Sequence, residues 1–226
     1  MDLLGTKMLF ASGGSLAYSW LCDFEYPWEA IPHVADMIVK LGQELNDGYA
    51  CVGENIWIAK SAKIASTVQI KGPCIICEDA ELRQGAFLRG SALVGRGAVV
   101  GNSTELKNCI LFDEVQVPHY NYVGDSILGY RAHMGAGAIT SNVKGDRTPI
   151  TIWYGEVPIE THLLKLGAML GDHAEIGCNS VLNPGTVIGA HTNVYPLSSV
   201  RGYVPANSIY KGKKNILQKY TGEGRI

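Results

Sequence analysis

Residues 76–100 read ICEDAELRQGAFLRGSALVGRGAVV, and an aliphatic side chain returns at every sixth position of this stretch. The same spacing runs beyond it on both sides, so that nine aliphatic residues follow one another at intervals of six: Ile58, Ile64, Ile70, Ile76, Leu82, Leu88, Val94, Val100 and Leu106. The residue four places after each of the first eight is small or slim: Ala62, Val68, Cys74, Ala80, Ala86, Ala92, Ala98 and Thr104. Neither an α-helix nor an alternating strand has this period. It indicates hexapeptide repeats.

The same pattern, an aliphatic residue at every sixth position and a small residue four places after it, returns near the C-terminus. Its aliphatic positions are Leu170, Ile176, Leu182, Ile188, Val194 and Val200. Their small companions are Ala174, Ser180, Thr186, Thr192 and Ser198. Each six-residue unit supplies one short strand and one corner, so three units make a turn of a triangular coil that stacks about 4.8 Å above the last turn. The sequence therefore predicts an all-β fold, a single-stranded parallel β-helix with aliphatic side chains inside.

The register slips between the two runs. Leu111 follows Leu106 by five residues, Leu128 follows Val123 by five, and Met134 restores the spacing of six. From residue 141 to residue 165 the period disappears. We expect this segment, with its exposed Thr151-Ile-Trp-Tyr154, to be a loop extruded from the coil, and loops on rigid scaffolds often carry function.

Both ends of the chain lack the period. Residues 1–50 form an N-terminal segment in which an amphipathic helix is predicted over 26–46, placed to cap the open end of the β-helix of residues 51–205. Residues 206–226 form a short basic tail that contains Lys211, Lys213, Lys214 and Lys219. The charges of this tail are either a solvated face or a contact for the phosphates of a nucleotide cofactor.

Composition favours an ordinary soluble globular protein. The chain has 226 residues, a net charge of -2, 18% charged and 46% hydrophobic residues, and 27 glycines that suit a fold with many tight corners. We recognise neither a signal peptide nor a membrane span, and expect a cytoplasmic protein with its six cysteines reduced. Cys74 and Cys77 have no second pair at metal-binding spacing, so we expect them to be buried structural thiols.

The densest polar cluster of the predicted coil runs from Pro118 to Asp125 and is followed by the segment from Gly135 to Asn142. His119 lies in the first part. An imidazole titrates near neutral pH and accepts a proton from an attacking amine or hydroxyl, as transfer from a thioester requires. Taken alone, a histidine here is more often a structural residue than a base.

A family resemblance rests on these two segments. They contain His119-x-x-Tyr122-x-Gly124-Asp125 and Gly135-Ala136-Gly137-x-Ile139-Thr140-x-Asn142, and matching segments precede them at Leu88-Arg89, Val100-Gly101-Asn102 and Glu105-Leu106-Lys107. The chain resembles the C-terminal acetyltransferase domain of bifunctional glucosamine-1-phosphate acetyltransferase/N-acetylglucosamine-1-phosphate uridyltransferases, over about two thirds of its length. Residues 118–126 and 165–168 are most similar to the archaeal-type branch.

The resemblance implies a left-handed coil and an acyltransferase of nucleotide-sugar biosynthesis that moves an acetyl group from acetyl-CoA to an amino-sugar 1-phosphate, without a metal. It assigns His119 as the general base. It implies that the sugar phosphate is held by Arg89, Lys107, Tyr122 and Asn142, and that Ala136 and Cys178 border the cofactor. It also implies a homotrimer, and no nucleic-acid or membrane partner.

Three positions depart from the family pattern: His133, Val143 and Thr148 stand where the family has Asn, Tyr and Lys. A non-catalytic or regulatory β-helix protein is therefore the alternative. A zinc enzyme similar to γ-class carbonic anhydrases is a weaker one, because no two histidines have the four-residue separation of that family. No Gly-rich nucleotide loop precedes the predicted helix, so we expect no nucleotidyl transfer.

Overall fold

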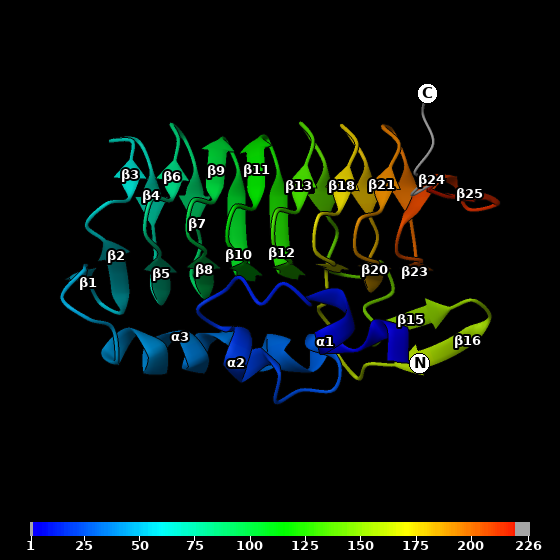
Figure 1. Ribbon diagram of the computed structural model, residues 1–226, viewed down its shortest axis with the longest axis horizontal. Coiled ribbons are helices and arrows are strands. Elements are labelled where there is room, and N and C mark those ends of the chain that lie inside the picture. Colours follow the sequence, from blue (N-terminus) through cyan, green and yellow to red (C-terminus); the bar gives the residue numbers. More distant parts are fainter. Residues whose placement is uncertain (1, 220–226) are drawn as a thin grey trace, which may run out of the picture.

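A computed structural model describes residues 2–219 and shows a long triangular coil with helices along one side (Figure 1). Each turn contributes one short strand to each of three faces, and the parallel strands of successive turns pair along the coil. The predicted parallel β-helix of hexapeptide repeats is confirmed.

We name the three faces in the order in which the chain visits them. The first face contains β2 (Ile56–Ala59), β5 (Cys74–Ile76), β8 (Ala92–Val94), β17 (Ala168–Leu170), β20 (Thr186–Ile188) and β23 (Tyr203–Val204). The second face contains β3 (Lys63–Ile64), β6 (Glu81–Leu82), β9 (Val99–Asn102), β11 (Gln116–His119), β13 (His133–Met134), β18 (Glu175–Ile176), β21 (Asn193–Val194) and β24 (Ser208–Gly212). The third face contains β4 (Gln69–Ile70), β7 (Phe87–Leu88), β14 (Ile139–Thr140), β19 (Val181–Leu182) and β22 (Ser199–Val200). The strands β10 (Glu105–Leu111) and β12 (Tyr122–Leu128) bend around a corner and belong to the third and first faces.

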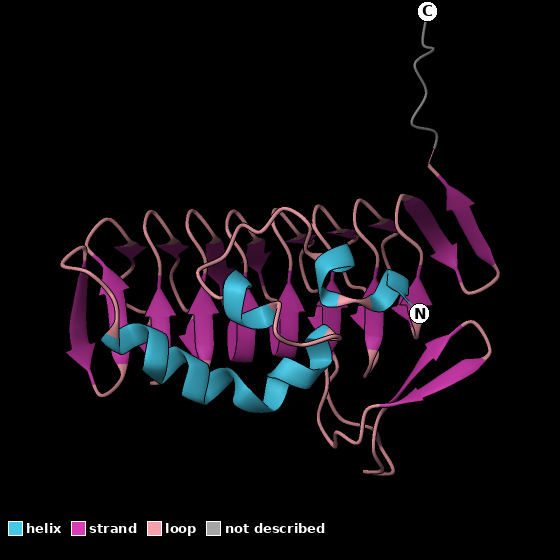
Figure 2. Cartoon of the chain, turned by 60° about the horizontal axis from the view of Figure 1, so that its bottom comes forward, coloured by secondary structure: helices cyan, strands magenta, loops and turns pink. Residues whose placement is uncertain are grey.

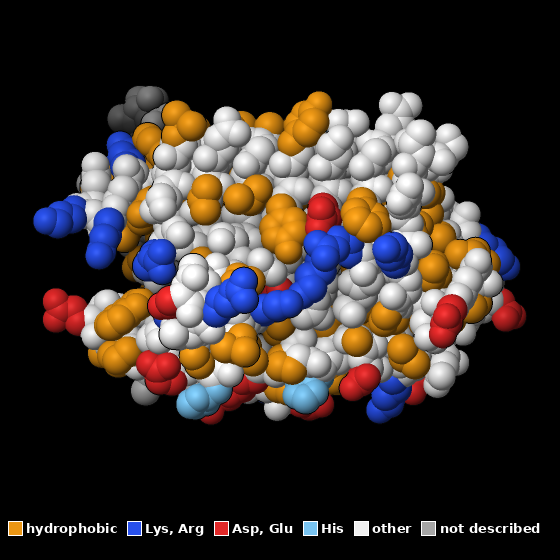
Figure 3. All heavy atoms as spheres, turned by 180° about the vertical axis from the view of Figure 1, so that it is seen from behind, with side chains coloured by type: hydrophobic (Ala, Val, Ile, Leu, Met, Phe, Trp, Pro, Cys, Tyr) orange, Lys and Arg blue, Asp and Glu red, His pale blue; other side chains and the backbone are white. Residues whose placement is uncertain are grey.

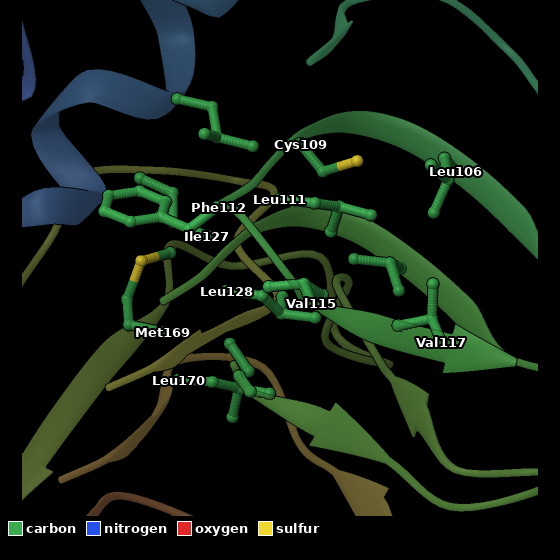
Figure 4. Close-up of a cluster of buried hydrophobic side chains, with 14 of the residues drawn as sticks. Leu106, Cys109, Leu111, Phe112, Val115, Val117, Ile127, Leu128, Met169 and Leu170 are labelled. Atoms are coloured by element: carbon green, nitrogen blue, oxygen red, sulfur yellow. The ribbon is translucent and has the colours of Figure 1, made fainter. Parts of the chain in front are cut away.

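The aliphatic positions of the repeat fill the interior of the coil. Leu111 pairs with Leu128, and Leu128 pairs with Leu170, so that the three side chains stack along the axis (Figure 4). All three are fully buried. Complete burial of such a side chain stabilises the fold by about 1.5–3 kcal/mol, so the stack accounts for the six-residue period.

A second apolar row faces outward from the first face. In each of four strands, the middle residue of a three-residue stretch points outward because its two neighbours point inward. These four outward residues are nevertheless fully buried: Ile75, Leu93, Ile110 and Ile127. The N-terminal segment contains η1 (Asp2–Leu4), α1 (Thr6–Leu9), α2 (Tyr18–Leu21), η2 (Pro27–His33) and α3 (Val34–Gln43). Of these, α3 contacts β5, β8 and β10, and η2 contacts β12, so that both lie over the row. The first face is therefore closed by helices (Figure 2).

The predicted helix over 26–46 differs from the structure in two ways. It is divided into η2 and α3, with Pro32 inside the 3-10 part. It also runs along the first face, where it contacts β5, β8 and β10, instead of capping the open end of the coil. The reason is the outward apolar row, which requires a cover along its whole length.

Hairpins protect the two ends of the coil. At the start, β1 (Tyr49–Gly53) pairs antiparallel with β2, and at the other end β25 (Asn215–Gln218) pairs antiparallel with β24. Both hairpins cover strand edges that would otherwise be unpaired. Residues 208–218 of the predicted tail thus form a hairpin, and residues 220–226 lie outside the described part of the chain.

The predicted loop of residues 141–165 leaves the coil after β14 and rejoins it at β17. Its centre is a hairpin of β15 (Thr151–Tyr154) and β16 (Val157–Glu160). Ile152 is fully buried, whereas Trp153 is 44% exposed, so only part of the expected exposed stretch faces solvent.

Cys74 and Cys77 are buried and have free thiols, as predicted. Burial raises the pKa of both thiols, to about 12 for Cys77.

Candidate active site

The two five-residue steps in the sequence mark one corner of the coil. Between Leu88 and Val94 this corner contains Gly90 and Ser91, whereas in β10 and β12 it is one residue shorter. Asn108 and Asp125 make these short corners with φ of +50° and +48°. Asn and Asp tolerate this left-handed conformation better than most residues. The shortening explains the register slip.

Asp125 is the centre of a hydrogen-bond network at this corner. Its carboxylate is 2% exposed and accepts hydrogen bonds from Lys107 Nζ at 2.8 and 3.0 Å and from Asn108 Nδ2 at 2.8 Å. It also accepts one from Asn142 Nδ2. A buried carboxylate is costly unless it is paired and hydrogen-bonded. Asp125 meets both conditions, and it fixes Lys107 and Asn142 in place.

Tyr122 extends the network on the third face. Its hydroxyl accepts a hydrogen bond from Asn142 Nδ2 at 3.3 Å. Burial raises the pKa of Tyr122, and the nearby charges of Asp125 and Glu105 raise it further. The hydroxyl therefore stays protonated at neutral pH and is available as a donor.

Arg89 lies one strand below Lys107, since its N–H donates to the carbonyl of Leu106. Its Nη1 is 2.7 Å from Oε1 of Glu105. Both cations that the sequence assigned to a phosphate are thus paired with carboxylates. The four formal charges cancel, so an incoming phosphate must compete with Glu105 for Arg89.

His119 ends β11 at the corner between the second and third faces and is exposed. Its backbone N–H donates to Asn121 Oδ1 at 3.1 Å, and its ring makes no hydrogen bond with residues 2–219. Three residues of β12, Tyr122 to Gly124, separate this corner from the one at Asp125, a span of about 10 Å. His119 and the Asp125 network therefore lie at opposite edges of the third face.

The predicted cofactor residues continue along the corner of His119. The N–H of Gly137 donates to the carbonyl of His119 at 3.0 Å, and the N–H of Asn179 donates to the carbonyl of Ala136 at 2.8 Å. Ala136 and the exposed Cys178 therefore follow His119 on successive turns. The N–H of Ala136 has no hydrogen-bond partner within the described chain.

The structure thus brings Lys107, Tyr122 and Asn142 into one network, with Arg89 beside it, and aligns His119, Ala136 and Cys178 on the neighbouring corner. Sequence reasoning assigned no role to Asp125, Asn108 or Glu105. The five-residue steps were the available signal for the first two. Nothing in the spacing indicated that Glu105 would pair with Arg89.

The side chains at the three positions that depart from the family pattern contribute no hydrogen bond to the Asp125 network. His133 Nδ1 lies 2.8 Å from Oε2 of Glu175, within hydrogen-bond distance. Val143 is 42% exposed, and Thr148 Oγ1 donates to Asp146 Oδ1 at 2.9 Å. Within residues 2–219 no three His, Cys, Asp or Glu side chains are grouped so that they could hold a metal ion.

No helix of the described residues has the length and apolar character to cross a membrane. The fold and the site define a hexapeptide-repeat β-helix protein. Within that class, residues 70–164 match the family model described as GMPPB C-terminal domain.

Curated relatives agree with the resemblance seen in the sequence. The bifunctional sugar-1-phosphate nucleotidylyltransferase/acetyltransferase of Sulfurisphaera tokodaii is 30% identical over 166 residues, which cover 66% of this chain and 41% of that protein. The bifunctional protein GlmU of Methanococcus maripaludis is 31% identical over 174 residues, which cover 75% of this chain and 42% of that protein. The chain thus spans about two fifths of the length of these relatives. The predicted resemblance is confirmed, and the prediction of a transferase agrees with the relatives' names.

Solved structures that the chain matches include a putative acetyltransferase of Bacillus cereus, with a TM-score of 0.41 and 21% identity. That match covers 74% of this chain and 78% of the other. The acetyltransferase domain of PglB from Neisseria gonorrhoeae has a TM-score of 0.37 and 13% identity, over 77% of this chain and 63% of the domain.

Proposed function

We propose that this protein transfers the acetyl group of acetyl-CoA to the amine of an amino-sugar phosphate. The observation that carries the proposal is the alignment of an exposed, unbonded imidazole at His119 with the free N–H of Ala136 on one corner, beside the polar network of the third face. The sugar-1-phosphate and acetyltransferase names of the curated relatives support the substrate class.

In the proposed reaction, the amine nitrogen attacks the thioester carbonyl carbon, so that a C–N bond forms and the C–S bond breaks. His119 takes the proton that the amine loses and returns it to the departing thiolate, which leaves as CoA thiol. The N–H of Ala136 stabilises the carbonyl oxygen as it gains negative charge. Metal participation is not required by these steps.

Asn142 and Tyr122 orient the acceptor by hydrogen bonds, because Asp125 holds the side chain of Asn142 and Asn142 in turn donates to the hydroxyl of Tyr122. Arg89 and Lys107 bind its phosphate. The pairing of Arg89 with Glu105 makes the phosphate contact a competition, so the phosphate requirement of the acceptor has to be measured.

A trimer completes the proposal. The helices cover the first face, which leaves the second and third faces for neighbouring subunits. Identical prisms pack around a threefold axis through such faces, and cyclic symmetry is usual for soluble oligomers. Light scattering after size exclusion should give the mass of three chains.

Release of CoA thiol from acetyl-CoA tests the activity, with glucosamine 1-phosphate, galactosamine 1-phosphate and the two free amino sugars as acceptors. We expect His119→Asn to lower kcat by about 10²–10⁴-fold, the usual contribution of a general base. His162→Asn, an exposed histidine of the extruded loop, is the matched control and should retain full activity. Thiol release from none of the acceptors, or a fully active His119→Asn protein, would contradict the proposal.

A non-catalytic β-helix protein is the second candidate, because both phosphate-binding cations are paired with carboxylates. Calorimetry with acetyl-CoA separates the two: no heat of binding favours this alternative, and saturable binding favours the enzyme.

A further inference from the structure

A pocket of about 650 Å³ lies at the C-terminal end of the coil, between the two hairpins that depart from the repeat. Trp153 and Glu156 line it from the β15–β16 hairpin, and Lys213 lines it from the β24–β25 hairpin. Its floor includes Ser199 and Arg201, at the end of the third face. Figures 1 and 2 show both hairpins at this end of the molecule. Neither His119 nor any residue of the Asp125 network lines this pocket.

The β15–β16 side of the pocket is fixed against the coil. A Cβ atom on Gly202 would lie 2.7 Å from the carbonyl oxygen of Trp153, so that the hairpin backbone touches the corner at this glycine. The rings of Tyr154 and Tyr203 pack with centroids 5.3 Å apart, and Ile152 is fully buried. These contacts indicate a preformed pocket.

The lining combines aromatic surface with positive charge. Trp153, which is 44% exposed, and Tyr203 both line the pocket. Arg201 and Lys213 form no salt bridge with residues 2–219, unlike Arg89 and Lys107. Glu156 is the single carboxylate of the lining, so the pocket carries a net positive charge.

Arg201 is also oriented, since its Nη2 donates to Asn183 Oδ1 at 3.2 Å. Its remaining N–H groups are available to a phosphate, for which guanidinium is a two-pronged donor. Exposed indole and phenol rings stack on planar bases. Seen from behind, the molecule carries a row of Lys and Arg side chains across the middle of this view (Figure 3).

We propose that this pocket binds the base and phosphates of a nucleotide. The strands β12, β14, β19 and β22 are successive neighbours on the third face, so Ser199 lies about 14 Å from Tyr122 along the coil. A nucleotide in the pocket therefore lies on the same face as the transfer site, and an extended ligand reaches both. The nucleotide belongs either to CoA or to a nucleotide-linked sugar; this link to a substrate rests on the proposed function, whereas the binding site itself does not.

Calorimetry on the His119→Asn protein tests the site without turnover. The probes are UDP, GDP, adenosine 3′,5′-bisphosphate, CoA and inorganic phosphate. We expect at least one nucleotide to bind, and both Arg201→Ala and Trp153→Ala to weaken that binding about tenfold or more, at unchanged melting temperature. Lys60→Ala, an exposed lysine at the other end of the coil, is the control and should bind as the parent does.

The pattern of binding identifies the source of the nucleotide. Binding of the bisphosphate and CoA indicates the acetyl donor, whereas binding of UDP or GDP indicates a nucleotide-linked sugar. The site is refuted when no nucleotide binds, or when the Arg201→Ala and Trp153→Ala proteins bind as tightly as the parent. Neither result depends on thiol release, so a failure here is distinct from a failure of acetyl transfer.

Discussion

Lys107 Nζ lies 2.8 Å from Oδ1 of Asp125, a carboxylate that is 2% exposed. The pair joins two successive turns, because Lys107 is in β10 and Asp125 is in β12. Asn108 and Asn142 donate to the same carboxylate. Asp125 is therefore a positioning residue, which holds two side chains of the proposed acceptor site at a one-residue corner.

A double-mutant cycle tests this coupling through stability. Asp125→Asn keeps the shape and the left-handed corner but places an amide where Lys107 needs an acceptor. We expect the single change to destabilise the fold by about 1–3 kcal/mol, since it leaves buried donors unsatisfied. In a Lys107→Met background the same change should cost less, with a coupling of about 0.5–3 kcal/mol in urea unfolding. Additive effects of the two substitutions would show that the ion pair contributes nothing.

Cysteine labelling with a disulfide reagent tests the proposed cofactor corner. Cys51 and Cys178 are exposed, whereas burial raises the pKa of Cys77 and Cys109 to about 12, which leaves almost no reactive thiolate. In a Cys51→Ser protein, Cys178 should therefore react first. Acetyl-CoA, whose thioester has no free thiol to consume the reagent, should at ten times its Kd slow that reaction about tenfold by mass action.

Two outcomes would count against this placement of the cofactor: a labelling rate at Cys178 that acetyl-CoA leaves unchanged, or protection of Cys51 in the unsubstituted chain instead. Labelling of the unsubstituted chain, in which both exposed thiols react, supplies the reference rate.

The coil could be predicted from the sequence because each turn repeats the same requirement: an aliphatic residue such as Leu88 inside and a small residue such as Ala86 beside it. Such a periodic requirement is visible in one chain without any knowledge of long-range contacts. The cover of the first face was less visible. Its signal is a second row, with Ile75 and Leu93 eighteen residues apart, that an uncovered prism would expose.

The site was only partly predictable for a related reason. The residues His119, Tyr122 and Asn142 could be chosen by their resemblance to a motif, but the contacts of Tyr122 and Asn142 depend on the corner that Asp125 makes. Pairing of Arg89 with Glu105 depends on the register of adjacent turns and on rotamers, which the local sequence does not define. The proposed nucleotide pocket depends on how the β15–β16 and β24–β25 hairpins pack, and neither β15–β16 nor β25 follows the six-residue spacing.

Substitution of Gly101 tests how tightly successive turns of the coil pack next to the strand that ends at His119. A Cβ atom at this position would lie 1.6 Å from the carbonyl oxygen of Pro118, so Gly101→Ala must displace the backbone just before His119. We expect a loss of about 3 kcal/mol in thermal or urea unfolding. Gly145→Ala in the extruded loop is the matched control, because no atom lies within 4 Å of its Cβ position. It should be neutral or stabilise by up to about 1 kcal/mol. Equal stabilities of the two variants would show that the turns do not pack as described.

His191 makes the stability of the fold weakly dependent on pH. Its ring stacks on His173 with centroids 4.6 Å apart, and Asp172 and Lys219 are the other charged groups near it. Partial burial lowers the pKa of His191 below its ordinary value of 6.5, and the neighbouring His173 and Lys219 lower it further. The unfolded chain therefore binds a proton more readily than the folded one, so the contribution of His191 is present above pH 6.5 and is lost as the pH falls below it. The ring of His191 is largely exposed, so its effect on stability is small. We expect His191→Gln to reduce the drop in melting temperature between pH 7 and pH 5 by only about 1–2 °C. The control is His33→Gln, at another exposed histidine. A larger drop in the His191→Gln protein than in the parent would reverse the sign of the argument.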